Sequence, residues 1–273
     1  MRLAGIRAVT LDFGNTLVPV DRKALRAVVI RTAEDVCTAL AIADTATFLL
    51  AWAEERDRQF REEVPRFREV DLPQRSMRVL ARLRGAAVPS ESESWDDVAV
   101  AVWSTPDEVA LIVNAYSAAF VATITAPPQS GALIHGLARR GFRVAILSNW
   151  PLAATIDRFA EVAGWIPSLA GIFVSQRIGT IKPHPAIFAH AQAELAVEAS
   201  AILHVGDDWL ADVSGAKAAG WRAAYLVGHQ GDTPLPTSAR TADVRADLDL
   251  EALTMLGDHL DDPPPARPRH PTA

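Results

Sequence analysis

LDFGNTLV at residues 11–18, LSNW at 147–150, IKPHPAIF at 181–188 and HVGDDWLAD at 204–212 are the four stretches that decide the fold of this chain. Each stretch follows, directly or closely, an apolar run with the composition of a buried strand. The carboxyl ends of parallel strands meet at one edge of a sheet, so the carboxylates, hydroxyl and amine of these stretches are expected to converge there. The sequence therefore predicts one functional site.

The apolar runs also indicate the class of fold. Helical patterns of ten or more residues separate the expected strands, which cover residues 6–11, 143–147, 172–174, 201–205 and 223–227. Strands that alternate with helices in this way are typical of βαβ units. We therefore expect an α/β protein with a doubly wound parallel-sheet, Rossmann-like core.

A long insertion separates the first two expected strands. Its pattern is helical from residue 21 to residue 120, far more than one crossover helix needs. It is expected to form an all-α domain, with hinges at residues 17–20 and 126–130. The predicted organisation is an α/β core of residues 1–20 and 126–260, a helical domain of residues 21–125, and a disordered Pro-rich tail, DDPPPARPRHPTA, of residues 261–273.

Composition narrows the possible partners and compartments. The 273 residues carry a formal net charge of −6, which argues against nucleic acid as a partner. Cys37 is the single cysteine, so no intramolecular disulfide is possible and a reducing compartment is the simplest one. No apolar run approaches the roughly 20 residues of a membrane helix, and no signal-peptide pattern is present at the N-terminus. We expect a cytoplasmic protein that binds neither nucleic acid nor membrane, as a monomer or homodimer.

In order and spacing, the four stretches resemble the motifs of the haloacid dehalogenase-like (HAD) hydrolase superfamily, from Ile6 to about Leu250. The resemblance implies a phosphatase whose helical insertion, between motifs one and two, is a cap that closes over the site and selects the substrate. It makes Asp12 the nucleophile that forms an aspartyl-phosphate. It gives phosphate binding to Thr16, Ser148, Asn149 and Lys182, the last also a catalytic residue that neutralises the phosphate and Asp12.

The resemblance also implies a magnesium site. Its ligands would be Asp12, the backbone carbonyl of Gly14 and Asp207. Asp207 and Asp208 are adjacent carboxylates that repel unless a cation is bound. Asp208 and Asp212 are expected in outer or loop-fixing roles, and helix capping is the alternative, above all for Asp208. Histidines 135, 184, 190, 204 and 229 show no metal-ligand spacing and are expected to be structural.

Gly14 departs from the pattern, because most phosphatases of the family carry a second Asp at this place. Loss of such a general acid/base typically costs about 10²–10⁴-fold in rate. The reaction could proceed with an acidic leaving group, such as an aryl or acyl phosphate, or with a proton donor from the cap, where Asp21 and the cap arginines are the nearest candidates. Glycine could instead serve a positive φ at this turn.

Three functions remain open, with a Mg²⁺-dependent phosphohydrolase of a small phosphorylated metabolite first. A catalytically impaired protein that binds a phosphorylated ligand or a protein partner comes second, supported only by Gly14. A haloacid dehalogenase comes third, because that group also lacks the second Asp but needs no metal ligands. A phosphonate-cleaving relative would need a cap lysine, and Lys23, the only one, stands at the very start of the cap. The cap arginines at 56, 58, 61, 66 and 68 alternate with glutamates, which indicates a solvated, ion-paired helix face, although one could hold an anionic substrate.

Overall fold

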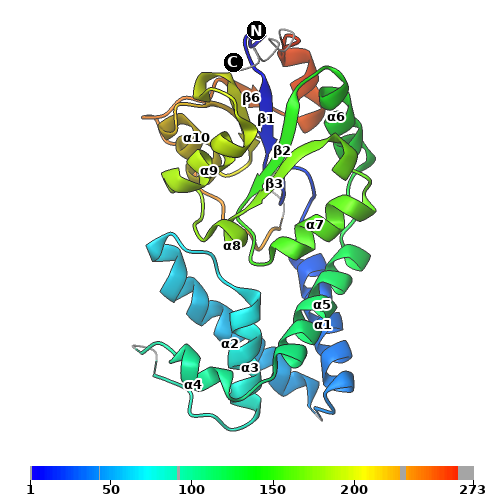
Figure 1. Cartoon of the computed structure of the whole chain (residues 1–273), viewed down its shortest axis with the longest axis vertical. Helices are drawn as coiled ribbons and strands as arrows, with labels where there is room; N and C mark the ends of the chain where they lie inside the picture. Colours follow the sequence, from blue (N-terminus) through cyan, green and yellow to red (C-terminus); the bar gives the residue numbers. More distant parts are fainter. Residues whose placement is uncertain (1, 43, 91–92, 228–231, 264–273) are drawn as a thin grey trace, which may run out of the picture.

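The computed structural model describes residues 2–42, 44–90, 93–227 and 232–263. Its centre is a six-stranded parallel sheet in the order β3-β2-β1-β4-β5-β6 (Figure 1). The strands are β1 Ala8–Leu11, β2 Arg143–Ser148, β3 Leu169–Val174, β4 Ile202–Gly206, β5 Arg222–Leu226 and β6 Leu248–Leu250. The predicted doubly wound α/β core is confirmed. The bounds of β1, β2, β4 and β5 differ from the expected ones by one or two residues, and β3 begins three residues before the expected Ile172. β6 is an edge strand that the sequence pattern did not predict.

The sheet is buried on both faces, which explains why its strands read as continuous apolar runs. All four residues of β1 are buried. Val9 and Leu11 belong to the hydrophobic cluster that includes side chains of α6 (Pro128–Arg139) and α7 (Ala153–Val162). Ala8 belongs to a second cluster, with side chains of α9 (Pro185–Leu195) and of the π-helical turn η4 (Trp209–Ser214). Alternate side chains of one strand thus bind the two helical layers to the sheet.

The helical domain lies between β1 and β2 and is grouped below the sheet in Figure 1, on the side where the strands end. Its helices are α1 Arg22–Ala39, α2 Thr45–Glu63, α3 Leu72–Leu83, α4 Asp97–Ala101 and α5 Pro106–Thr123, with a short 3₁₀ turn η1, Val64–Arg66. Helix α1 packs along α5, and α2 packs against α3. Each of the five begins at an Asp or Thr whose side chain accepts a hydrogen bond from the first turn, as stable helix starts require.

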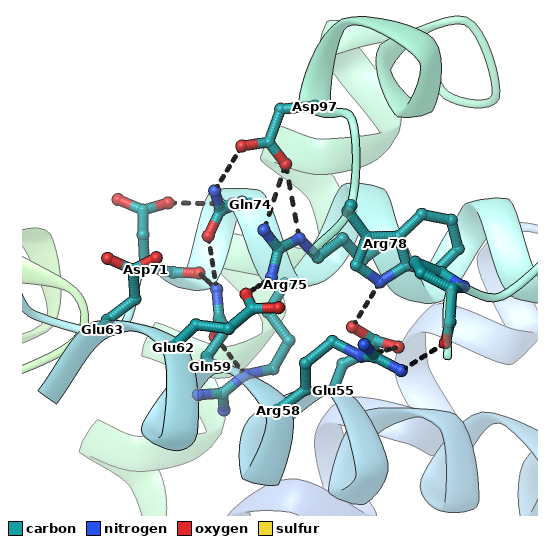
Figure 2. A network of polar contacts seen from close by, with 12 residues as sticks. Glu55, Arg58, Gln59, Glu62, Glu63, Asp71, Gln74, Arg75, Arg78 and Asp97 are labelled. Atoms are coloured by element: carbon teal, nitrogen blue, oxygen red, sulfur yellow. Dashed lines mark hydrogen bonds and ion pairs between the residues drawn. The ribbon is translucent and has the colours of Figure 1, made fainter. Parts of the chain in front are cut away.

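Buried ion pairs hold the far part of this cap together (Figure 2). Glu55 is fully buried and accepts hydrogen bonds from Arg82 Nη1 at 2.8 Å and Trp95 Nε1 at 2.9 Å. Arg58 is only 7% exposed and donates to the backbone carbonyls of Pro89, Ser90 and Glu93. The expected solvated arginine face is therefore wrong for Arg58, which binds these three residues between α3 and α4. Arg78, also buried, pairs in the same way with acidic side chains of α2 and α4.

The two chain crossings between core and cap lie against each other. Ser130 Oγ, at the start of α6, donates to the backbone carbonyl of Leu17 at 2.7 Å. The Val20 carbonyl accepts from Thr233 Oγ1 at 2.9 Å, and Arg22 pairs with Asp232 at 2.9 Å. Both predicted hinge segments are thus tied to the core at neighbouring points.

The remaining elements complete the helical layers. They are α8 Ser175–Ile178, α10 Gly215–Ala218 and three 3₁₀ turns, Ile166–Ser168, Ala199–Ala201 and Leu253–His259. Asp261 donates its N–H to the Leu3 carbonyl, and Asp262 pairs with Arg140. The expected disordered tail is therefore wrong for these two residues, and residues 264–273 of that prediction lie outside the described residues.

Within the described ranges, no single helix is both long and apolar enough to span a membrane. One pair, α5 and α6, meets the length and composition criteria together but is bent by 97°.

Candidate active site

A pocket of about 100 Å³ opens where β1, β2 and β4 end. It is lined by eight of the nine predicted site residues: Asp12, Gly14, Ser148, Asn149, Lys182, Asp207, Asp208 and Asp212. Leu235 and Pro236, which lie between β5 and β6, also line it and were not predicted. Of the nine, Thr16 lies outside this lining.

Lys182 stands at the centre of the charged groups. Its Nζ lies 2.8 Å from Asp12 Oδ1, 2.5 Å from Asp212 Oδ1 and 2.9 Å from the Leu147 carbonyl, so all three N–H donors have an acceptor. The side chain is 2% exposed. Burial alone would lower the pKa of this ammonium, but the Asp12 and Asp212 carboxylates raise it above its ordinary value. Lys182 is therefore a fixed positive charge in contact with the predicted nucleophile.

Asp212 connects Lys182 to a buried histidine. His204 Nε2 lies 3.0 Å from Asp212 Oδ1, and His204 Nδ1 lies 2.9 Å from Thr10 Oγ1. Burial and then the charge of Lys182 lower the pKa of His204, so the ring is neutral. Since a carboxylate only accepts, Nε2 carries the proton and donates to Asp212, while Nδ1 accepts from Thr10. Burial raises the pKa of Asp212, but Lys182 and His204 together outweigh it and hold that pKa below its ordinary value.

Asp212 fixes the loop after β4, one of the two roles expected for it, because it accepts from the Asp208 N–H at 2.9 Å. It also contacts Lys182 directly, which the sequence did not predict. His204 orients this carboxylate. Gly206 leaves room for it, because a Cβ at residue 206 would overlap the Asp212 carboxylate. The sequence offered one signal for this arrangement, the lack of a side chain at the end of β4.

Three carboxylates surround a candidate cation position. One oxygen each of Asp12, Asp207 and Asp212 lies within 4.8 Å of the others. Burial, followed by the charges of Asp12 and Asp212, raises the pKa of Asp207 to about 8. Burial also raises the pKa of Asp12 to about 6, although Lys182 opposes it. Carboxylate oxygens suit a hard divalent cation such as Mg²⁺, and the charge of such a cation would favour the ionised form of all three side chains.

The smaller polar residues position the charged ones. Thr16 Oγ1 donates to Asp207 Oδ1 at 3.3 Å. A hydrogen bond from Ser148 helps to lower the pKa of Asp12. Asn149 exchanges two hydrogen bonds with the backbone of Lys182, at 2.7 and 3.0 Å. The phosphate-binding roles expected for Thr16, Ser148 and Asn149 stay predictions, while the geometry adds a positioning role for Asn149.

Asp208 fixes the loop that follows β4, one of the two roles expected for it. Its Oδ1 accepts from the Ala211 N–H at 2.7 Å, which caps η4, and from Ser238 Oγ at 2.6 Å. The Asp208 side chain thus joins the start of η4 to the chain segment that carries Leu235.

Packing, rather than a positive φ, explains why residue 14 is a glycine. The positive φ in this turn belongs to Asn15, at 58°, and Gly14 is not among the positive-φ glycines of the described residues. A Cβ at residue 14 would lie 2.5 Å from Leu235 Cδ1 and 3.4 Å from Trp150 Cζ3. The space beside Gly14 is therefore filled by Leu235. The nearest proton donor named from the sequence, Asp21, accepts from Ala24 N at the start of α1 and does not line the pocket.

The comparisons with known proteins agree with this fold. Residues 6–220 match the family model of the haloacid dehalogenase-like hydrolases. The chain is therefore a hydrolase with an α/β core, and it belongs to the haloacid dehalogenase-like hydrolase family, as the four motifs indicated.

Curated relatives match over part of their length. The chain is 28% identical over 107 residues to the haloacid dehalogenase-like hydrolase domain-containing protein 3 of Mus musculus, which is 39% of this chain and 41% of the relative. It is 32% identical over 108 residues to phosphatase MT3486 of Mycobacterium tuberculosis (strain CDC 1551 / Oshkosh), which is 39% of this chain and 48% of the relative. The chain thus aligns with less than half the length of these relatives.

Solved structures share the fold over nearly the whole chain. A 2-haloacid dehalogenase from Pseudomonas syringae pv. Tomato DC3000 has a TM-score of 0.66 at 21% identity, over 93% of this chain and 97% of that one. An HAD phosphatase from Thermococcus onnurineus has a TM-score of 0.55 at 17% identity, over 93% and 97%.

Proposed function

We propose that the protein is a Mg²⁺-dependent phosphohydrolase that transfers the phosphoryl group of a small phosphorylated metabolite to Asp12. The observation that carries this proposal is the contact of one buried ammonium, on Lys182, with Asp12 inside a cluster of three carboxylates. Such a cluster is costly unless it holds a cation. Asp12 and Asp207 with the Gly14 carbonyl are the proposed ligands, and Asp212 lies close enough to contribute. The bound ion would supply positive charge for the oxygens of the transferring group.

The reaction proceeds in two displacements. An Asp12 oxygen bonds to phosphorus, and the bond from phosphorus to the leaving oxygen breaks, with its electron pair on the leaving group. In the second step, water bonds to phosphorus and the bond to Asp12 breaks. Inorganic phosphate and the free Asp12 carboxylate result, and one proton from water goes to solvent. Lys182 stabilises the negative charge next to Asp12 in both steps.

Gly14 restricts the leaving group. None of the described residues that line the pocket replaces the missing acid beside it, since Leu235 fills that space. A leaving group that departs without a proton is therefore favoured, which points to an acyl or aryl phosphate rather than an alkyl phosphate.

One observation favours the dehalogenase alternative, because Leu235 gives the wall beside Asp12 an apolar character. The three-carboxylate cluster weighs against it, since halide displacement by Asp12 needs no cation. The second alternative, a non-catalytic phosphate binder, would keep the same charged groups without turnover.

A substrate panel separates these functions. Acyl, aryl and alkyl phosphates and 2-chloropropionate are incubated with the protein, with Mg²⁺ or with EDTA, and phosphate and chloride release are measured. We expect Mg²⁺-dependent phosphate release from acyl or aryl phosphates, lost in Asp12→Asn. Chloride release would establish the dehalogenase. Phosphate-ester binding without release of either product would establish the binder.

A further inference from the structure

The chain segment of residues 232–241, which precedes β6, lies at the mouth of the pocket and contributes Leu235 and Pro236 to its lining. It is held on both sides of the pocket. Thr233 Oγ1 accepts from Asn15 Nδ2 at 2.9 Å on the β1 side. Ser238 Oγ donates to Asp208 Oδ1 and accepts from Leu210 N, both at 2.6 Å, on the β4 side. We call this stretch the 232–241 segment.

Leu235 fills the place that a side chain at residue 14 would take. An ideal Cβ on Gly14 would stand 2.5 Å from Leu235 Cδ1, closer than real carbon atoms approach. Trp150, 3% exposed, closes the same side, with Cζ3 at 3.4 Å from that Cβ position. Gly14, Leu235 and Trp150 therefore form one apolar wall next to Asp12, which we call the Gly14–Leu235 wall.

The wall leaves little room. The pocket holds about 100 Å³. Pockets for drug-sized ligands measure about 300–1,000 Å³. A phosphoryl group fits this volume, but a bulky leaving group beside Leu235 does not.

We propose that Leu235 is a specificity-determining residue and that the Gly14–Leu235 wall restricts the enzyme to small acyl phosphates. This inference rests on the proposed phosphohydrolase function. The wall offers no proton, so the leaving group departs as an anion. A carboxylic acid, with an ordinary pKa of about 4, leaves readily in this form, whereas a phenol, at about 10, leaves less readily. Small size and an acidic leaving group together define a mixed anhydride of phosphate and a short carboxylic acid.

Two substrates with the same leaving chemistry and different size test the wall. Acetyl phosphate and benzoyl phosphate both release a carboxylate, and kcat/KM is measured for each with Mg²⁺ present. We expect the parent to prefer acetyl phosphate. In Leu235→Ala the ratio of benzoyl to acetyl kcat/KM should rise by about 10- to 100-fold, since a few methylenes in an apolar pocket discriminate by this amount. The intrinsic reactivities of the two anhydrides cancel when the ratio of the variant is divided by the ratio of the parent.

Matched variants exclude a general effect of truncation. Leu50 is a leucine of the cap with 60% exposure, so Leu50→Ala removes the same atoms away from the pocket and should leave the ratio unchanged. Leu235→Val, a smaller truncation, should give an intermediate ratio and serves if Leu235→Ala does not fold. Melting temperatures are recorded for all variants.

The outcomes distinguish the two levels of the proposal. A parent that hydrolyses neither anhydride, nor any other phosphate of the panel, overturns the phosphohydrolase function itself. A parent that hydrolyses both, with a ratio that Leu235→Ala and Leu235→Val leave unchanged, overturns the role of Leu235 while the phosphohydrolase stands.

Discussion

Replacement of Lys182 by methionine is expected to lower the free energy of unfolding at neutral pH by about 3–5 kcal/mol, the typical cost of removing one partner from a buried ion pair. Methionine keeps an unbranched stem of similar length. It leaves Asp12 and Asp212 buried without the ammonium that lies 2.8 and 2.5 Å from them. The side chain of Asp212 is only 2% exposed, so water does not solvate the carboxylate that has lost its partner.

The size of this effect translates into a large thermal shift. A loss of 1 kcal/mol lowers the melting temperature of a domain of this size by about 2–4 °C, so Lys182→Met should melt about 6–20 °C below the parent. Adding Asp212→Asn removes one of the two unpaired charges. The double variant should regain about 1–2 kcal/mol, because residues of one ion-pair network do not contribute additively.

Lysine 217 provides the matched control. Its Nζ lies 2.9 Å from Asp247, and its side chain is 31% exposed. Lys217→Met should therefore cost no more than about 1 kcal/mol, as partly exposed pairs do.

Urea unfolding at pH 7.5 and at pH 5 measures both lysine variants in metal-free buffer. In Lys182→Met, burial still raises the pKa of Asp12 and Asp212, while the ammonium that lowers both pKa values is gone. Both carboxylates then take up protons more readily in the folded state than in the unfolded state, so the penalty for their buried charge shrinks as the pH falls. The deficit of Lys182→Met should therefore be smaller at pH 5 than at pH 7.5. A deficit below about 1 kcal/mol at pH 7.5, or equal deficits for the two lysines, would refute the assignment of Lys182 as the central charge.

Three further results are expected. Mg²⁺ at about 100 times its Kd should stabilise the parent by about 2.7 kcal/mol, and Asp207→Asn should abolish this gain. If Mg²⁺ leaves the melting temperature of the parent unchanged, the protein has no metal site here. Burial raises the pKa of Glu69, at the contact of cap and core with Ser175, to about 7. Its contribution to stability is present below its unfolded pKa and lost as the pH rises through 7. In urea unfolding, the free energy of unfolding of the parent should therefore fall between pH 5 and pH 8, and that of Glu69→Gln should fall less. An equal fall in both proteins would contradict this. Gly14→Asp alone should gain little turnover of an alkyl phosphate because Leu235 occupies the space, whereas Gly14→Asp with Leu235→Ala should gain up to about 10²-fold; the same gain in both backgrounds would show that Leu235 does not obstruct residue 14.

The parallel core could be predicted because each strand is an apolar run next to a turn with chemical side chains. Asp12 follows β1 and Ser148 ends β2, as the strand pattern indicated. Parallel pairing of β1 with both β2 and β4 then brings Asp12 and Asp207 to one edge. Strand β6 was missed because three residues are too short to show a period.

The contacts inside the site were less accessible from sequence. Lys182 Nζ reaches Asp212 across the turn η4, and no local spacing reveals that His204 supports the same carboxylate from within a strand. The position of Leu235 in the pocket could not be predicted for another reason. The 232–241 segment has no periodic pattern, and tertiary hydrogen bonds such as that of Ser238 with Asp208 set its place. The volume beside Gly14 therefore follows only from three-dimensional packing.

The hydrogen bond between Ser130 and the Leu17 carbonyl has an evolutionary consequence. Because the chain leaves the sheet and returns to it at neighbouring points, the inserted helices have almost no distance to bridge. The entropic cost of closing a loop grows slowly, by about 0.6 kcal/mol for each doubling of its length. Insertions of very different length and sequence can therefore occupy this position without disturbing the strand ends. The helical insertion can thus change in size and surface while Asp12 and Lys182 keep their places at the strand ends.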